Sequence, residues 1–210
     1  MRLGILGGSF NPVHCGHLAV ARAARDAHRL DRVLFVPAGR PPHKCEELAP
    51  PEHRLAMVRL AIEGIPEFAA SDIETTRRGT TYTVDTLEEL RRREPGAELF
   101  FVMGEDSVAE FRKWKEPERI LALARVVVVN RPGAQGRFLR EEYPGVPESV
   151  LDRIERDRVF MADCPIEARA IRDAVRSGAS IEGMVPPRVA EYIAEHGLYR
   201  GAGASGRPVV

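Results

Sequence analysis

The sequence predicts an α/β fold, a Rossmann-like doubly wound parallel sheet with a small C-terminal helical portion. Short apolar, β-branched or aromatic runs alternate with longer segments of helical character along the chain. The apolar runs are continuous, which is typical of parallel strands that helices cover on both faces. Right-handed crossovers between such strands give the doubly wound topology, in which ligands bind at the carboxyl ends of the strands.

The elements follow in order from the same patterns. Strands are expected at residues 3–6, 33–36, 70–73, 99–103, 126–129 and 159–161. Helices are expected at residues 17–28, 52–63, 84–93, 106–111, 116–124, 168–176 and 187–195. Two loops rich in Pro and Gly are expected at residues 37–51 and 131–147. We expect one domain over residues 1–200, with its helical portion at about 165–200, and a tail without fixed structure at 201–210.

Bulk composition excludes several classes of protein. The 31 Lys and Arg residues balance 31 Asp and Glu residues, so no basic excess indicates a nucleic-acid partner. No apolar run approaches the roughly 18 residues of a membrane helix, and the first residues lack a signal-peptide pattern, so we expect a cytoplasmic protein. The three cysteines form no C-x-x-C pair, which argues against a disulfide framework. A zinc site at Cys15, Cys45 and the two neighbouring histidines lacks the usual ligand spacing.

The most informative segment follows the first strand. Residues 7–17 read G-G-S-F-N-P-V-H-C-G-H, directly before a helical pattern. Gly7 and Gly8 permit a close approach of the backbone to a ligand. His14 and His17 stand where a helix begins, and a helix start offers N–H donors and the positive end of the dipole to phosphate. The segment predicts a nucleotide-phosphate site, the alternative being a pair of partly buried loop histidines.

Other candidates lie where later strands end. Lys44, in the loop after the second strand, is either a phosphate contact or a solvated side chain. Asp106 follows Met103-Gly104 and suits a helix cap, a ribose contact, or both. Trp114 is the only tryptophan, and the charges around it favour a pocket lip, where its ring would stack on an aromatic ring. The hydroxyls and N–H groups of residues 80–86 suit a small carboxylate.

Together these segments resemble the bacterial nicotinate-nucleotide adenylyltransferases, members of the nucleotidyltransferase superfamily with the signature (H/T)-x-G-H. The signature alone specifies the superfamily. The segments V-P-A-G-R-P-P-H-K (36–44), R-G-T-T-Y-T-V-D-T-L (78–87), G-E-D-S (104–107) and W-K-E-P-E-R-I (114–120) narrow the resemblance to the family. So do Arg131-Pro132-Gly133 and residues 185–199, so the resemblance covers nearly the whole chain.

The resemblance implies transfer of AMP from ATP to nicotinate mononucleotide, which gives deamido-NAD and diphosphate, with Mg²⁺ carried by ATP. It implies that His14, His17 and Lys44 act on the phosphates. It assigns the nicotinate end to Thr81, Tyr82 and Trp114. It assigns the ATP and dinucleotide contacts to Gly7, Gly8, Ser9, Phe10, Gly104, Asp106 and Arg131. The partners are small-molecule substrates, without nucleic acid or membrane, and a homo-oligomer is left open.

One segment departs from the family pattern. The family carries I-S-x-T-x-x-R at a helix start, where hydroxyls and N–H groups hold the ATP phosphates. Here residues 166–172 read I-E-A-R-A-I-R, so Glu167 and Arg169 replace the hydroxyl residues. An alignment anchored on residues 159–165 instead leaves the motif partly deleted. Arg169 and Arg172 offer guanidinium forks for phosphate in place of the hydroxyls.

Two alternative functions remain open at the level of sequence. One is a nucleotidyltransferase that acts on another phosphate monoester, against which Trp114 and the Thr81-Tyr82 pair argue. The other is a non-catalytic nucleotide-binding protein on the same scaffold, which the altered I-S-x-T-x-x-R segment favours. Preference for nicotinate over nicotinamide mononucleotide does not follow from these residues.

Overall fold

The computed structural model describes residues 1–42, 48–130, 138, 140–143, 145–162 and 164–200. Six strands form one sheet in the order β3-β2-β1-β4-β5-β6, and every neighbouring pair is parallel. The strands are β1 (Arg2–Gly8), β2 (Arg32–Pro37), β3 (Phe68–Ala70), β4 (Glu98–Gly104), β5 (Arg125–Asn130) and β6 (Val159–Phe160). The strand order reverses between β1 and β4, and doubly wound sheets bind ligands at the carboxyl ends of the strands at such a point.

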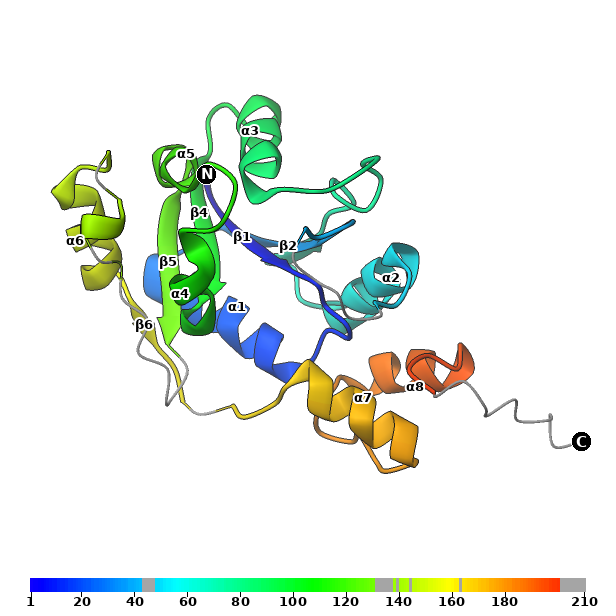
Figure 1. Ribbon diagram of the computed structural model, residues 1–210. Coiled ribbons are helices and arrows are strands. Elements are labelled where there is room, and N and C mark those ends of the chain that lie inside the picture. The colour runs from blue at the N-terminus through cyan, green and yellow to red at the C-terminus, as the bar shows by residue number, and fades with distance from the viewer. Residues whose placement is uncertain (43–47, 131–137, 139, 144, 163, 201–210) are drawn as a thin grey trace, which may run out of the picture.

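Helices connect the strands and cover both faces of the sheet (Figure 1). They are α1 (Cys15–His28), α2 (Pro51–Ala61), α3 (Thr83–Arg93), α4 (Val108–Phe111), α5 (Pro117–Leu123), α6 (Glu148–Arg156), α7 (Ala168–Ser177) and α8 (Pro187–Glu195). Two 3₁₀ turns, η1 (Glu105–Ser107) and η2 (Arg140–Glu142), complete the described elements. The predicted fold class, a doubly wound parallel sheet, is confirmed.

Alternate residues of the four central strands, β2, β1, β4 and β5, pack into two separate cores. Phe100 and Val102 of β4 pack with residues of α1, α2, α7 and α8. Leu99, Phe101 and Met103 pack on the other face with residues of α3, α4, α5 and α6. Strands buried on both faces read as continuous apolar runs, which explains the pattern in the sequence. The C-terminal helices α7 and α8 belong to the first of these cores, together with α1 and α2. The Tyr192 hydroxyl of α8 hydrogen-bonds to His53 Nδ1 of α2 at 2.9 Å.

Three element predictions need correction. The third strand covers Phe68–Ala70 instead of residues 70–73, because Ile73 is buried by packing in the loop beyond the sheet. The predicted helix 106–111 is a 3₁₀ turn followed by the four-residue α4. Helix α6 was not predicted, although Leu151 and Ile154 place two buried residues on one face of it. None of the described helices is long and apolar enough to cross a membrane.

Candidate active site

Where β1 ends, the backbone turns at the carboxyl edge of the sheet. Phe10 adopts a left-handed φ of 46°, and its side chain is completely buried in the core. A Cβ at Gly8 would lie 3.3 Å from the Phe10 ring, so glycine gives this ring room to fold back under the turn. Phe10 therefore turns its side chain into the protein, and only its backbone is placed to meet a ligand beside Gly7 and Ser9.

His14 and His17 lie together at the start of α1. Their ring centroids are 3.7 Å apart, and the His14 backbone N–H donates to His17 Nδ1 at 3.2 Å. Because Nδ1 accepts this bond, a neutral His17 carries its hydrogen on Nε2, which makes Nε2 a donor. His14 is 2% exposed and lies beneath the more accessible His17.

Gly16 and Phe10 set the positions of these rings. A Cβ at Gly16 would lie 3.0 Å from His14 Nδ1, so a side chain there would crowd the imidazole. The Phe10 ring meets His17 edge-on, with centroids 4.9 Å apart. The sequence prediction that both histidines stand at the first crossover agrees with their places in the fold.

A cavity of about 320 Å³ opens beside this turn. Among the residues that line it are six of the predicted site residues: Gly7, Gly8, Ser9, Thr81, Tyr82 and Trp114. The Trp114 ring is partly buried and packs on Phe101 and Phe111, at centroid distances of 5.9 and 5.2 Å. These contacts fix the indole at the wall of the cavity, as the stacking prediction requires.

The start of α3 supplies the polar end of the cavity. Thr81 is 3% exposed, and its buried hydroxyl has no hydrogen-bond partner among the described residues. The first N–H groups of a helix lack acceptors within the helix, and here they belong to Thr83 and the residues after it. Lys115 Nζ lies 4.9 Å from the centre of the Tyr82 ring and 2.9 Å from Asp85 Oδ1. The Thr81 hydroxyl, the first N–H group of α3 and Lys115, which is paired with Asp85, therefore belong to residues that line the same cavity.

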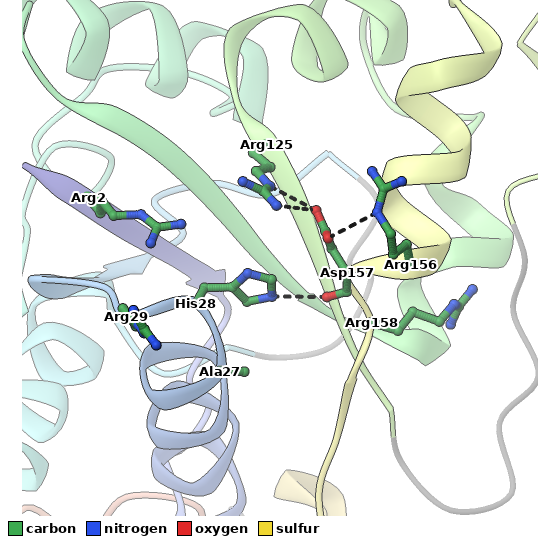
Figure 2. A pocket seen from close by; sticks show the side chains of 8 residues that line it. All are labelled: Arg2, Ala27, His28, Arg29, Arg125, Arg156, Asp157 and Arg158. Carbon is green, nitrogen blue, oxygen red and sulfur yellow. Dashed lines mark hydrogen bonds and ion pairs between the residues drawn. The ribbon is translucent and has the colours of Figure 1, made fainter.

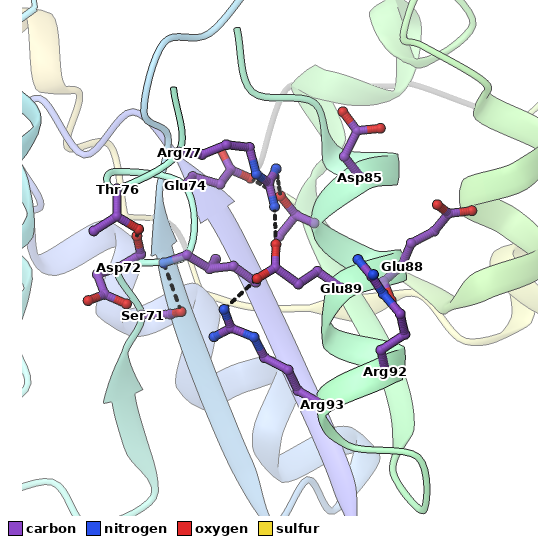
Figure 3. A network of polar contacts seen from close by, with 12 residues as sticks. Ser71, Asp72, Glu74, Thr76, Arg77, Asp85, Glu88, Glu89, Arg92 and Arg93 are labelled. Atoms are coloured by element: carbon purple, nitrogen blue, oxygen red, sulfur yellow. Dashed lines mark hydrogen bonds and ion pairs between the residues drawn. The ribbon is translucent and has the colours of Figure 1, made fainter. Parts of the chain in front are cut away.

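A polar network holds the segment that carries Thr81 against α3 (Figure 3). The Thr86 hydroxyl donates to the buried carboxylate of Glu74 at 2.7 Å. Arg77 donates to the Thr86 hydroxyl at 3.0 Å and to Glu89 at 2.6 Å, and this hydrogen bond holds the pKa of Glu89 below its usual value. A Cβ at Gly39 would lie 2.1 Å from the Glu74 carbonyl oxygen, so the loop after β2 packs directly on the segment around Glu74.

Arg54 of α2 forms hydrogen bonds to the loops around the site. It is 1% exposed and donates to the carbonyl oxygens of Ser9 at 2.8 Å, Gly39 at 3.0 Å and Ala49 at 2.8 Å. Neither Arg54 nor Glu74 was among the site residues that the sequence predicts. A charged residue at an otherwise apolar position of a helix was the only signal for Arg54, because its acceptors are backbone groups far apart in the chain.

The exit of β4 carries Gly104 and Asp106, neither of which lines the cavity. Asp106 is exposed, and a Cβ at Gly104 would lie 2.5 Å from its carboxylate, so glycine lets this side chain turn back over the strand end. Between them, Glu105 is buried and pairs with Arg158 at 3.1 Å. Asp106 is therefore accessible at the carboxyl edge of the sheet, and the ribose contact stays a prediction.

The start of α7 lies against the histidine turn, because the Ile166 carbonyl oxygen would be 3.5 Å from a Cβ at Gly16. Arg172 is buried and donates to the Asn11 carbonyl oxygen at 2.9 Å, so it supports the turn from within. Arg169 has 80% of its side chain exposed, with Asp173 at 3.9 Å. Lys44, a predicted phosphate contact, and Arg131, a predicted contact of ATP or the dinucleotide, lie outside the described residues.

The fold and this site define the class of nucleotidyltransferases, and a family model described as cytidylyltransferase-like matches residues 5–174. A probable nicotinate-nucleotide adenylyltransferase of Thermomicrobium roseum is 47% identical, over 95% of this chain and 92% of its own length. One from Thermus thermophilus is 44% identical, over 95% of this chain and all of its own length. The chain therefore belongs to the nicotinate-nucleotide adenylyltransferase family, and it is an enzyme of the adenylyltransferase type.

Solved structures agree on the fold. A Plasmodium falciparum nicotinic acid mononucleotide adenylyltransferase complexed with NaAD superimposes with a TM-score of 0.73 at 19% identity, covering 94% of this chain and 97% of the other. A putative nicotinate-nucleotide adenylyltransferase from Vibrio parahaemolyticus has a TM-score of 0.67 at 24% identity, over 96% and 97% of the two chains. The resemblance that the sequence motifs carried is thus confirmed at the level of family and fold.

Proposed function

We propose that the protein transfers AMP from ATP to nicotinate mononucleotide and releases deamido-NAD and diphosphate. The observation that carries the proposal is the cavity beside the β1 exit, because one space of about 320 Å³ brings together the glycine turn, Thr81, Tyr82 and Trp114. Those residues come from three separate parts of the chain, and the family resemblance assigns all of them to the dinucleotide.

The reaction needs positions and charges from the protein, and no protein nucleophile. A phosphate oxygen of the mononucleotide attacks the α-phosphorus of ATP, and the bond from that phosphorus to the bridging oxygen of the β-phosphate breaks. Diphosphate leaves with the electron pair of that bond. Negative charge grows on the bridging oxygen, so donors fixed beside it accelerate the step.

We assign the contact with that charge to His17, although neither His14 nor His17 lines the cavity itself. The hydrogen bond into Nδ1 fixes the ring and leaves the hydrogen of a neutral ring on Nε2. His14 supports it from beneath, and in this proposal both imidazoles contact the triphosphate. Lys44, Arg169 and Arg172 remain proposed phosphate contacts, Arg131 remains a proposed ATP or dinucleotide contact, and Asp106 remains a proposed contact of the adenosine ribose. Arg172 acts through the backbone of Asn11 as long as its hydrogen bond there persists.

The nicotinate end lies between Trp114 and the start of α3. The indole face stacks on the pyridine ring, which contributes about 1 kcal/mol beyond burial. The Thr81 hydroxyl and the first N–H groups of α3 then receive the carboxylate, which gives the buried hydroxyl a partner. A nicotinamide ring offers an amide there in place of two acceptor oxygens, so the site favours the nicotinate form.

ATP brings Mg²⁺ into this proposal. Within the described residues, no three His, Cys, Asp or Glu side chains form a cluster that could hold a metal ion. A Mg²⁺ ion that is bound by phosphate oxygens and water suits such a site, since Mg²⁺ keeps several waters and uses few protein ligands. When bound, the ion neutralises charge on the phosphates. A cytoplasmic location stays a prediction.

Diphosphate release in a panel of acceptors tests the function. The protein receives ATP and Mg²⁺ with nicotinate mononucleotide, nicotinamide mononucleotide, or phosphopantetheine as the acceptor. We expect the highest kcat/KM with nicotinate mononucleotide. The variant His17→Ala should lower kcat by about 10²–10³-fold with little change in mononucleotide affinity, as for the loss of a transition-state donor. A faster reaction with another phosphate monoester would overturn the substrate, and mononucleotide binding without any turnover would favour a non-catalytic protein.

A further inference from the structure

A second pocket lies at the opposite edge of the sheet, where the strands begin (Figure 2). Its volume is about 500 Å³, within the range of small-molecule sites. Five arginines and one carboxylate supply its charges: Arg2, Arg29, Arg125, Arg156, Arg158 and Asp157. They come from the start of β1, the ends of α1 and α6, and the starts of β5 and β6. We call this feature the arginine pocket.

Two of the five arginines are neutralised within the protein. Arg125 donates to the Asp157 carboxylate, with Nε at 2.9 Å. Arg158 donates to Glu155 at 2.7 Å and pairs with Glu105 at 3.1 Å. Figure 2 shows the Arg158 guanidinium turned away from Asp157, in keeping with those partners. The single carboxylate of the pocket therefore balances Arg125 and leaves three guanidinium groups to account for.

Arg29 and Arg156 keep their charge for a ligand, whereas Arg2 is paired within the protein. The Nε atom of Arg2 is buried without a hydrogen-bond partner among the described residues, and it forms an ion pair with Glu98 at 3.5 Å. Arg156 has 70% of its side chain exposed and approaches Asp157 only to 3.9 Å. Arg29 is exposed and forms no ion pair with a described carboxylate. All three side chains line the pocket.

The pocket holds its cations close together before any ligand arrives. Arg2 and Arg125 lie over the same Phe100 ring, at 4.8 and 5.4 Å from its centre. Such cation–π contacts fix the guanidinium groups, and like charges held together attract an anion. His28 donates from Nε2 to the Asp157 carbonyl oxygen at 2.9 Å. Burial lowers the pKa of His28, so its ring adds no charge at neutral pH.

Helix ends do not account for this charge by themselves. The C-terminal ends of α1 and α6 meet at the pocket, and each contributes about half a negative charge that favours a basic side chain. Together they balance about one arginine. Asp31 approaches the backbone N–H of Arg2 at 2.6 Å, outside the ring of side chains that lines the pocket. A positive excess remains at Arg29 and Arg156.

We propose that the arginine pocket binds a phosphate-bearing anion of the diphosphate type, either free or as the end of a nucleotide. The planar guanidinium fork matches the oxygens of a phosphate, and the forks of Arg29 and Arg156 in one pocket suit two linked phosphates. The pocket lies at the amino ends of the strands and the substrate cavity at the carboxyl ends, so the anion binds apart from the substrates. The proposal is independent of the reaction proposed above.

Calorimetric titration of inorganic diphosphate into the full chain tests the proposal. Two binding events are expected, one at each edge of the sheet. The double variant Arg29→Gln/Arg156→Gln should weaken one of them at least about tenfold, through loss of charge-assisted hydrogen bonds. His17→Ala should weaken only the other. Arg176→Gln, which removes an exposed arginine of α7, is the matched control and should leave both unchanged.

Further arms decide the chemistry and guard against misfolding. If ADP also produces the binding event that depends on Arg29 and Arg156, the pocket accepts the diphosphate end of a nucleotide. If ADP does not produce this event, the ligand is free diphosphate. Equal binding of sulfate at matched ionic strength would overturn the diphosphate class. A single event that Arg29→Gln/Arg156→Gln leaves unchanged would overturn the site. The melting temperature without anion checks each variant, and the single variant Arg29→Gln gives the decision if the double variant unfolds.

Discussion

Replacing Arg54 tests whether one buried side chain holds the site together. Arg54→Met keeps much of the side-chain length and removes the donors to the carbonyl oxygens of Ser9, Gly39 and Ala49. A buried acceptor left without its partner costs about 1–3 kcal/mol. Removal of the buried charge offsets part of this loss of stability, because burial makes the charge of the guanidinium unfavourable and lowers its pKa. We expect the free energy of unfolding to fall by about 3–5 kcal/mol.

Urea unfolding followed by Trp114 fluorescence measures this loss, and steady-state kinetics measures its consequence for the site. KM for both substrates should rise in Arg54→Met, because the loops at Ser9 and Gly39 border the cavity. Arg59→Met is the matched control, because Arg59 is an exposed arginine of the same helix. Arg54→Lys should recover only part of the stability, since an ammonium cannot reach three carbonyls as a fork does. Equal stability of Arg54→Met and Arg59→Met would refute the reasoning, as would a loss of stability with unchanged KM.

Four further outcomes follow from the same structure. Trp114→Ala should raise KM for the mononucleotide about tenfold and leave KM for ATP unchanged; a change confined to ATP would place the indole at the other substrate. Thr81→Val should keep or slightly raise stability, because the lost hydroxyl has no partner in the described structure, and should raise KM for the mononucleotide. Restoring the family hydroxyls with Glu167→Ser/Arg169→Thr should lower KM for ATP; a higher KM would show that Arg169 contacts phosphate. Burial raises the pKa of Tyr143 to about 12 from 10, so its stabilising effect is complete below pH 10 and is lost as pH rises toward 12; alkaline denaturation should remove about 3 kcal/mol from the wild type and less from Tyr143→Phe.

Much of the fold and of the site follows from local sequence. The continuous apolar runs predicted a parallel sheet, and the glycines and histidines after the first strand predicted the turn. Ile73 shows the limit of such patterns, since an apolar residue reads the same in a strand and in a packed loop. The missed helix α6 shows another limit, because Leu151 and Ile154 give too short an apolar stripe between loop-like segments.

The residues that support the site could not be predicted from the sequence, for a different physical reason. Arg54 and Arg172 donate to backbone carbonyls, and every residue offers such an acceptor, so no pairing pattern marks them. Glu74 is recognisable only through Thr86, twelve positions along the chain. Functional side chains that point into a cavity carry motif signals, whereas residues that fix those side chains depend on the three-dimensional arrangement.

The contacts that hold α7 in place have a consequence for how this end of the protein can change over evolutionary time. Its start is held by Arg172 on Asn11, and the Cys15 N–H donates to the Met184 carbonyl oxygen at 3.0 Å. None of these contacts uses residues 167 or 169. Substitutions at those two surface positions can therefore accumulate while the helix keeps its seat, and a lineage can trade one set of phosphate contacts for another without first losing the architecture that would carry the new one.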